Sequence, residues 1–284
     1  MLFPTVFASL AIAVSATQCN REFLKYTTSN YVLAQRGGVV AGVSGYTSPD
    51  LIYTENGKTL DINKGSVLSQ AIDYDYTFSV HDIVRCTTFT EIIAASTPHP
   101  YVIHTRMEFN ATASDGLPAA TLIESIVTDA GDWLFNATGT LDLAKPEKWA
   151  PIPAAQQDTR AVVQSIGDAY FNRFGDSSIT VPWAAPCYRL EGGIAVKGTM
   201  HNDTGVCEMV WPTAVYIPYR RYVVDEELGV VDLFIGFPGL DSTQGNNSMP
   251  DSHLFRVEGG KIKYVHTASA CVADGCGFNG TFGR

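Results

Sequence analysis

The chain contains one arrangement twice: an amphipathic helix followed by a series of strand-like runs. In the first half, apolar residues at helical spacing predict a helix over residues 20–36 that ends at Gly37 and Gly38. In the second half, the same spacing predicts a helix over residues 156–174 that ends at Gly175. The runs that follow each helix are rich in β-branched and aromatic residues. This recurrence indicates an internal duplication and an α+β fold.

Turn residues separate the strand-like runs and set the expected boundaries. The strands predicted for the first half are a hairpin over 50–62 and runs over 74–94, 101–109 and 120–128. Those predicted for the second half are 179–183, 188–197, 221–226, 230–237 and a closing hairpin of 252–257 and 261–267. We expect each half to be a cone, in which a helix packs on a curved, mostly antiparallel sheet and leaves an apolar mouth.

The amino terminus predicts a secreted protein. Its first sixteen residues, MLFPTVFASLAIAVSA, carry no charge, are too short to span a bilayer and end in an A-x-A-like pattern, which is typical of a signal cut after Ala16. The location expected is therefore the secretory pathway lumen or the exterior. The domains expected are a signal (1–16), an N-terminal half (17–143), a Pro-rich connector packed through Trp149 (144–154), a C-terminal half (155–271) and a tail (272–284).

Composition narrows the partners and the chemistry. A formal charge of −10 argues against nucleic acid, and against an anionic membrane after signal cleavage. The sequence has no P-loop, dinucleotide fingerprint, G-x-S-x-G elbow or zinc-ligand spacing, so no cofactor or metal is expected. Five sequons permit glycosylation in the same compartment, at Asn110, Asn136, Asn202, Asn246 and Asn279.

The six cysteines predict three disulfides in an oxidising compartment. Sequence alone does not choose among the connectivities. We favour Cys187 with Cys207, because they bracket one glycine-rich excursion. The other expected pairs are Cys19 with Cys86 and Cys271 with Cys276.

The closing hairpin carries the strongest candidate chemistry. Strict alternation places His253, Phe255 and Val257 on one side of its first strand, and Ile262, Tyr264 and His266 on one side of its second. We therefore expect both histidines to face one aromatic-lined space, where imidazoles can transfer protons near neutral pH. The alternative is that each is a hydrogen-bonded core residue.

An acid and an aromatic pair extend this candidate site. Asp232 lies inside an apolar strand, where it either faces solvent or is buried with a raised pKa as a base. Tyr170 on the second helix is a candidate proton donor. Trp183, like Tyr264, is expected to line the substrate space, although core packing explains Tyr170 and Trp183 more economically.

Several arginines are expected to line or rim the second cone. Together they suit an anionic ligand, because guanidinium binds carboxylates in a bidentate fork and stabilises enolates. The alternative is that these arginines are solvated at the surface or pair with Asp225, Glu226 and Glu191. The candidates are Arg160, Arg189, Arg220, Arg221 and Arg256.

A second pocket in the first half is a weaker hypothesis. His81-Asp82 begins one predicted strand, and Arg106 and Glu108 lie on another. The alternative is that these residues only stabilise the fold.

Two adjoining passages carry a family resemblance. The passage RRYVVDEELGVVDLFIGF, followed by PDSHLFRVEGGKIKYVHT, resembles the closing strands of ketosteroid-isomerase-like and SnoaL-like domains. The wider pattern resembles a secreted fungal family with an uncharacterised domain, and lies in DAGDWLF (129–135), WAPIP (149–153), DTR (158–160), DAY (168–170), VPW (181–183), PCYRLEGG (186–193) and RRYVVD (220–225).

The resemblance implies a function that the residues alone do not. Members with a named role are dimerising cyclases of fungal maleidride biosynthesis. It therefore implies a cofactor-free cyclase of secondary metabolism that dimerises maleic anhydride-type monomers by base-assisted carbanion addition. The substrate would be a small anionic or anhydride-type molecule, and helper proteins of the same pathway would be partners. The alternative is a secreted small-molecule-binding protein without turnover.

Overall fold

The computed structural model of the protein describes residues 19–110, 118–195, 207–209, 211, 215–238 and 248–272. The expected signal, the residues Asn202, Asn246, Cys276 and Asn279, and nearly all of the tail lie outside these residues. The helices described are α1 (Arg21–Gly37), α2 (Ala137–Ala144) and α3 (Arg160–Gly175), with 3-10 turns at Val40–Gly42, Ser44–Tyr46, Val67–Ser69 and Ala154–Gln156. No described helix is long and apolar enough to cross a membrane.

Both long helices begin at side-chain caps. The Asn20 side chain accepts a hydrogen bond from the Phe23 amide, and the Thr159 side chain accepts one from Val162, so each satisfies an amide that has no partner within its helix. Helix α1 ends at Gly38, which adopts a left-handed conformation with a φ of 61°. Both predicted helices are therefore confirmed, and α3 begins four residues later than the apolar spacing suggested.

The described strands form two six-stranded mixed sheets with the same strand order, β2-β1-β6-β5-β4-β3 and β8-β7-β12-β11-β10-β9. In each sheet the first long strand runs parallel to the last, and the other pairs are antiparallel. The strands of the first sheet are β1 (Thr47–Glu55), β2 (Lys58–Thr59), β3 (Tyr76–Asp82), β4 (Thr87–Ala94), β5 (Tyr101–Asn110) and β6 (Ala119–Thr128). Those of the second are β7 (Trp183–Glu191), β8 (Ile194–Ala195), β9 (Arg221–Asp225), β10 (Val230–Phe237), β11 (Met249–Glu258) and β12 (Lys261–Ser269).

The duplication extends to strand register and to irregularities. Asp82 at the end of β3 pairs with Thr87, and Asp225 at the end of β9 pairs with Val230, across turns of equal length. The last turn residue has a positive φ in both halves, 54° at Cys86 and 57° at Gly229. Each last hairpin also has a one-residue bulge on its final strand, where the register shifts beside Glu108 in one half and Arg256 in the other. The two halves therefore share one architecture, and the expected α+β class is confirmed.

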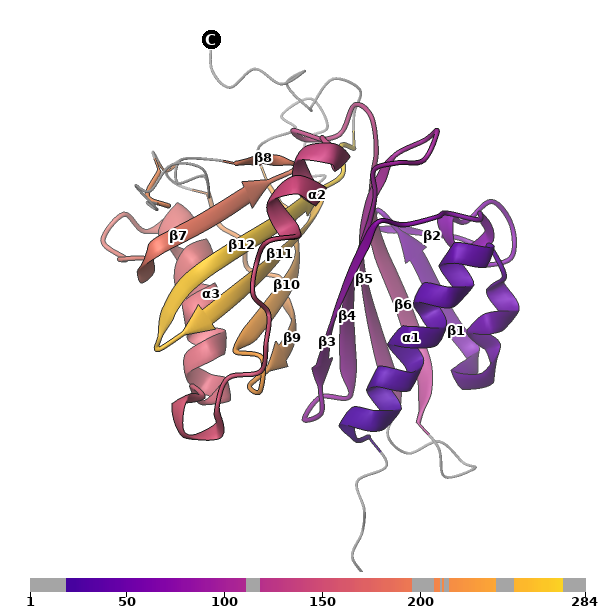
Figure 1. Ribbon diagram of the computed structural model, residues 1–284, viewed down its shortest axis with the longest axis horizontal. Helices are drawn as coiled ribbons and strands as arrows, with labels where there is room; N and C mark the ends of the chain where they lie inside the picture. Colours follow the sequence, from indigo (N-terminus) through magenta and orange to yellow (C-terminus); the bar gives the residue numbers. More distant parts are fainter. Residues whose placement is uncertain are drawn as a thin grey trace, which may run out of the picture.

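The two sheets pack face to face, and the long helices cover their outer faces (Figure 1). This produces three apolar layers. The N-terminal core lies between α1 and the first sheet and includes Leu24, Tyr31, Ile103 and Met107. The C-terminal core lies between α3 and the second sheet and includes Tyr170, Phe171, Phe174, Trp211 and Phe255. The inter-sheet core includes Phe89, Ile126, Phe234, Leu254 and Ala268.

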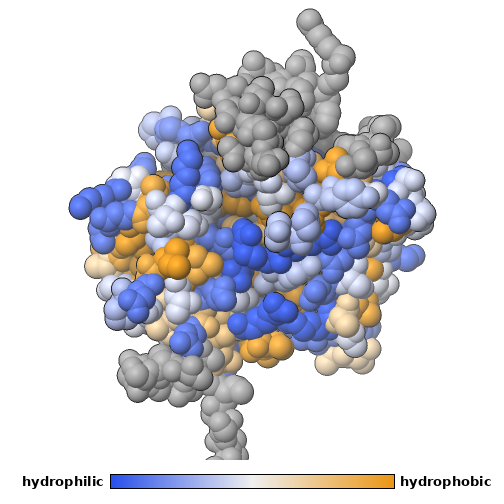
Figure 2. All heavy atoms as spheres, turned by 180° about the vertical axis from the view of Figure 1, so that it is seen from behind, coloured by the Kyte–Doolittle hydropathy of each residue, from blue (hydrophilic) through white to orange (hydrophobic). Residues whose placement is uncertain are grey.

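Two predicted disulfides are present, Cys19 with Cys86 and Cys187 with Cys207. Cys271 is also disulfide-bonded, and its expected partner Cys276 lies outside the described residues. The connector packs through Trp149, as expected, because this ring contacts Phe78, Tyr264 and His266. The surface seen from the opposite side is largely hydrophilic, with hydrophobic patches separated from one another (Figure 2).

Some predicted elements differ from the structure. The run over 74–94 is two strands joined by a turn, and the run over 179–183 is not a strand until Trp183, where β7 begins. Helix α2 was not predicted. It is short, it begins at Asn136, whose exposed side chain caps Gly139, and it packs between the two sheets through Ala137 and Leu141.

Candidate functional site

The C-terminal core brings together four of the residues predicted from the sequence: Tyr170, Trp183, Arg189 and His253. Tyr170 projects from α3, and its ring lies 5.9 Å from Trp183 and 5.3 Å from His253, measured between ring centroids. Phe171, the next residue on α3, packs against the opposite hairpin with its ring 4.9 Å from that of His253. The result is an aromatic enclosure around one imidazole.

The buried imidazole of His253 has a carboxylate beside it. His253 Nδ1 lies 3.2 Å from Asp251 Oδ1, at a distance suited to an ion pair but without hydrogen-bond geometry. The Ser269 hydroxyl donates to the same carboxylate oxygen at 3.0 Å. All three side chains are buried on one face of the β11–β12 hairpin. Asp251 thus faces the imidazole that we expected to be chemically active.

A cation lies on the same side of the sheet. Arg189 on β7 is buried, and its Nε lies 3.2 Å from Glu191 Oε1 without hydrogen-bond geometry. Burial would lower the pKa of the Arg189 guanidinium, but Tyr170 and the carboxylates of Glu191 and Glu208 raise it. Burial raises the pKa of the Tyr170 phenol well above its usual range, and a hydrogen bond with Glu191 raises it further, so this hydroxyl stays protonated. Tyr170 and Arg189 therefore offer donors near His253.

The equivalent positions of the N-terminal core provide an internal comparison. Tyr31 occupies on α1 the place that Tyr170 occupies on α3, and its hydroxyl bonds to Thr105 at 2.7 Å. Thr105 stands where β11 has His253, and it bonds in turn to Ser125 at 2.8 Å. Neutral hydroxyls therefore satisfy one another in the first half, whereas His253 and Arg189 in the second half retain nitrogens without a hydrogen bond. Of the two cores, the C-terminal one has the arrangement of a reactive site.

The prediction that His266 shares this space is wrong. The bulge on β12 adds one residue between Ile262 and Tyr264, so alternation reverses after Ile262. Tyr264 and His266 consequently face the inter-sheet core. His266 Nδ1 lies 3.0 Å from Glu91 Oε1 on β4, and His266 Nε2 lies 2.6 Å from Glu147 Oε2 on the connector.

A buried polar network continues from His266 across both sheets. Glu91 also contacts His104 at 3.2 Å, and His104 contacts the Ser252 hydroxyl at 2.9 Å. Ser252 donates to Asp232 at 2.7 Å. Asp232 is fully buried with a pKa raised well above its usual range by desolvation, as one reading of the sequence had it. It lies in this network, however, and not beside His253.

The charges of this network stabilise one another. Burial would lower the pKa of His266, but the Glu147 and Glu91 carboxylates raise it well above its usual range. Burial would raise the pKa of Glu91, but His266 and His104 hold it far below the ordinary carboxyl value. Desolvation dominates at Glu147, whose pKa is raised. His266 is therefore an imidazolium between carboxylates, which makes it a structural group.

Three of the predicted arginines form ion pairs with other residues of the protein and do not lie in the C-terminal core. Arg160 pairs with Asp82 of the first half at 2.5 Å. Arg221 pairs with Glu124, also of the first half, at 3.0 Å. Arg256 donates to the carbonyls of Leu228 and Ala150 and pairs with Glu258. These three arginines form ion pairs, as the alternative had it, but their partners are Asp82, Glu124 and Glu258 and not the expected Asp225, Glu226 and Glu191.

Sequence reasoning missed several residues that shape the two clusters. Asp251 was detectable, because it lies two residues before His253 and therefore on the same strand face. Glu91, His104 and Glu147 carried no local signal, since each meets His266 or Ser252 only through the packing of one sheet on the other. Arg106 and Glu108 do not join His81-Asp82: Arg106 pairs with Glu108 and Glu124.

A pocket of about 280 Å³ adjoins the C-terminal core. Its lining includes Phe171, Tyr216 and Arg220, and Phe171 also contacts His253. The Arg220 guanidinium lies over the Phe171 ring at 5.6 Å and donates to Asp168 at 2.6 Å. One aromatic side chain therefore links this pocket to the buried imidazole.

Comparison with protein families gives a match over the second half of the chain. Residues 156–269 match a family model described as a domain of unknown function (DUF8021), from just before α3 to the end of β12. Neither a curated protein nor a solved structure matches the chain. The matched region contains the C-terminal core with His253, Arg189 and Tyr170.

Proposed function

We propose that the protein is a cofactor-free enzyme of carbon–carbon bond formation, a cyclase that joins maleic anhydride-type monomers, with its site in the C-terminal core. The observation that carries this proposal is the buried His253 beside Asp251, which faces Tyr170 in an aromatic enclosure with Arg189 on the same side of the sheet. We also propose that each half is a ketosteroid-isomerase-like cone. The shared strand order and the resemblance of the closing strands support that assignment.

The chemistry requires a base, a site for negative charge and two oriented monomers. His253 would remove a proton from an alkyl carbon attached to the ring double bond, and the electron pair would move through that double bond into an anhydride carbonyl as an extended enolate. Arg189 would hold the developing oxygen charge, with the Tyr170 hydroxyl as a second donor. The carbanion carbon would then bond to the second monomer, and His253 would return the proton to the adduct. Holding both monomers in one enclosure supplies the proximity that this addition needs.

Asp251 is suited to orient the base. A carboxylate near Nδ1 favours the tautomer that leaves Nε2 free to accept a proton, and it stabilises the imidazolium that forms. The contact lacks hydrogen-bond geometry, so a small movement of the ring or of the carboxylate would be needed to align them. Phe171 would have to move for a monomer to pass from the adjoining pocket to His253.

The proposed location is the secretory lumen or the exterior. Two disulfides within the described residues, Cys19 with Cys86 and Cys187 with Cys207, fit an oxidising compartment. The sequence-based signal over residues 1–16 points the same way.

Binding without turnover is a second candidate, and aromatic packing favours it. Tyr170, Phe171 and Phe255 all place their rings within 6 Å of the His253 ring, so side chains already occupy the space around the imidazole. If these rings do not move, a ligand would occupy only the pocket lined by Phe171, Tyr216 and Arg220.

Incubation of the purified glycoprotein with anhydride monomers separates the two candidates. Formation of a dimeric product at a rate or with a stereochemistry that depends on active protein supports the enzyme. Saturable binding of the monomers with no such product supports the binding protein. Absence of both would contradict each candidate.

A further inference from the structure

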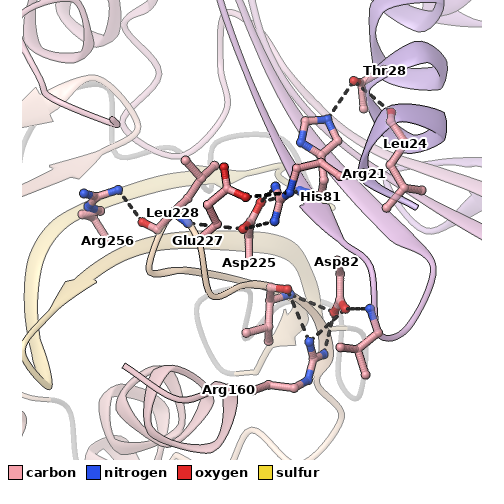
Figure 3. A network of polar contacts seen from close by, with 12 residues as sticks. Arg21, Leu24, Thr28, His81, Asp82, Arg160, Asp225, Glu227, Leu228 and Arg256 are labelled. Carbon is pink, nitrogen blue, oxygen red and sulfur yellow. Dashed lines mark hydrogen bonds and ion pairs between the residues drawn. The ribbon is translucent and has the colours of Figure 1, made fainter. Parts of the chain in front are cut away.

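A second pocket lies where the two halves meet, away from the C-terminal core. Its volume is about 430 Å³, in the range of small-molecule sites. Its lining comes from both halves: Arg21, His81 and Ile83 from the first, and from the second residues 154 and 157–159, together with Val224 and the acidic run Asp225–Glu227. Figure 3 shows part of this surface around Arg21, His81 and Asp225. Nothing in the reaction described above uses it.

The lining charges favour a cation. Four carboxylates, those of Asp158, Asp225, Glu226 and Glu227, oppose one guanidinium, that of Arg21. The Arg21 guanidinium already forms ion pairs with the carboxylates of Asp225 and Glu227, at 2.7 and 3.0 Å. Glu226 and Asp158 each accept only a backbone amide among the described residues, from Arg160 and Gly260 respectively. The field inside the pocket is therefore negative, and it would repel the anionic substrate expected from the sequence.

A buried ring nitrogen supplies an independent sign of a ligand. His81 lines the pocket and is only 6% exposed. The Thr28 hydroxyl lies 3.1 Å from His81 Nε2 and within hydrogen-bond distance of two helix carbonyls of α1; where it donates to a carbonyl, it accepts from Nε2, and the ring proton is on Nε2. His81 Nδ1 is then an acceptor with no partner among the described residues. Desolvation lowers the pKa of His81 to about 4. The Asp225 carboxylate opposes this shift, and the charges of Arg21 and Lys25 add to it. The ring of His81 therefore remains neutral near pH 7.

We infer that this junction pocket binds an organic cation with two or more amino groups, such as a short polyamine. Its ammonium groups would donate to Glu226 and Asp158, and to His81 Nδ1. A single metal ion fits less well, because no group of three or more His, Cys, Asp or Glu in the described part of the chain is arranged to hold one. A ligand here would contact both halves and so bind the assembled fold.

Calorimetric titration of the full glycoprotein with spermidine, at about 0.15 M salt, tests the inference. We expect saturable binding with one site. Glu226→Gln should weaken it by about tenfold, because a charged hydrogen bond is lost while the amide of Arg160 keeps an acceptor. Asp158→Asn gives a second measurement if Glu226→Gln lowers the melting temperature, because the asparagine keeps an acceptor for the Gly260 amide. The matched control is Asp142→Asn, which removes the same charge from an exposed position on α2 and should leave binding unchanged.

Three results would overturn the inference: no saturable heat, equal weakening by Asp142→Asn and Glu226→Gln, or binding of magnesium chloride alone in place of spermidine. Equal weakening would mean that the overall negative charge, and not this pocket, attracts the amine. Because neither variant touches the C-terminal core, these results are independent of the proposed enzymatic activity.

Discussion

Arg21, the first residue of α1, forms two hydrogen bonds with Asp225 at the end of β9, at 2.7 and 2.8 Å (Figure 3). The same contact occurs in the opposite direction, where Arg160, the first residue of α3, donates to Asp82 at the end of β3. Two backbone amides make equivalent contacts: the His81 amide donates to the Asp225 carboxylate, and the Val224 amide donates to the Asp82 carboxylate. Each half thus holds the other through equivalent atoms, as the two subunits of a symmetric dimer do.

Removing one partner of this exchange should destabilise the protein. Asp225→Ala leaves the His81 amide without its acceptor and the Arg21 guanidinium with Glu227 alone, in a part of the junction where the Asp225 side chain is fully buried. We expect the free energy of unfolding to fall by about 3 kcal/mol. Urea denaturation measures it.

The control for this prediction is Arg36→Ala, which breaks an exposed pair with Asp73. It should cost less than about 1 kcal/mol. Equal costs for the two variants would show that the reciprocal pairs do not hold the halves together.

His266→Phe should be strongly destabilising. The imidazolium lies between the buried carboxylates of Glu91 and Glu147, and a phenyl ring would leave both without their cation. We expect a loss of about 3 to 5 kcal/mol. Adding Glu91→Gln to this variant should recover part of the loss, because it removes one stranded charge.

An exposed histidine provides the comparison for that variant. His99 pairs with Asp129 at the surface, and His99→Phe should change the stability by less than about 1 kcal/mol. A His266→Phe protein as stable as the wild type would contradict the assignment of His266 as a structural cation.

The groups around His266 should make the protein more stable in weak acid than in weak alkali, and they outnumber His81, whose lowered pKa acts in the opposite direction between about pH 4 and 6.5. His266 has a raised pKa, so its contribution is complete below about 6.5 and is lost as the pH rises through the folded value. Asp232 and Glu147 have raised pKa values, so the folded state also favours their protonated forms and loses stability with rising pH. Glu91 has a lowered pKa, and its contribution is lost only as the pH falls below about 4.

Denaturation at about pH 5 and pH 8, on either side of the ordinary histidine pKa, tests the direction in which stability changes with pH. The wild type should be more stable at the lower pH. Asp232→Asn should reduce the difference in stability between the two pH values, because the asparagine side chain does not titrate. Greater stability at the higher pH would contradict the description of the network.

The Cys187–Cys207 disulfide should contribute independently of the site. It closes a loop with a sequence separation of 20 residues. Cys187→Ser with Cys207→Ser should lower the free energy of unfolding by about 3 kcal/mol, because the unfolded chain regains the entropy of that loop. Thermal denaturation under non-reducing conditions measures the change, and an unaltered melting temperature would refute it.

The sequence was informative where local patterns decide the structure. Capped helices, the duplicated order and the strand Val230–Phe237 follow from spacing and turn residues, and β10 has the predicted bounds. The bulge on β12 has no such signal, because alternation continues across Lys263 in the sequence although the register shifts there. His266 was therefore placed on the wrong face. The partners of Arg160 and Arg221 lie in the other half of the chain, and only the packing of the two sheets determines them.

The proposed base lies in the C-terminal core, and the duplicated N-terminal core provides an internal control. Tyr170 and Tyr31 occupy equivalent positions on α3 and α1, and both are about 1% exposed. Only Tyr170 lies beside a histidine. His253→Phe keeps the ring volume and should leave the fold intact while removing the proposed base.

The decisive measurement is therefore the rate of dimer formation from anhydride monomers by His253→Phe, Tyr170→Phe and Tyr31→Phe, with melting temperatures recorded for each. The account predicts a loss of roughly a hundredfold or more for His253→Phe, and a smaller loss for Tyr170→Phe. Tyr31→Phe should retain the wild-type rate. Equal rates for wild type and a folded His253→Phe protein would contradict the account.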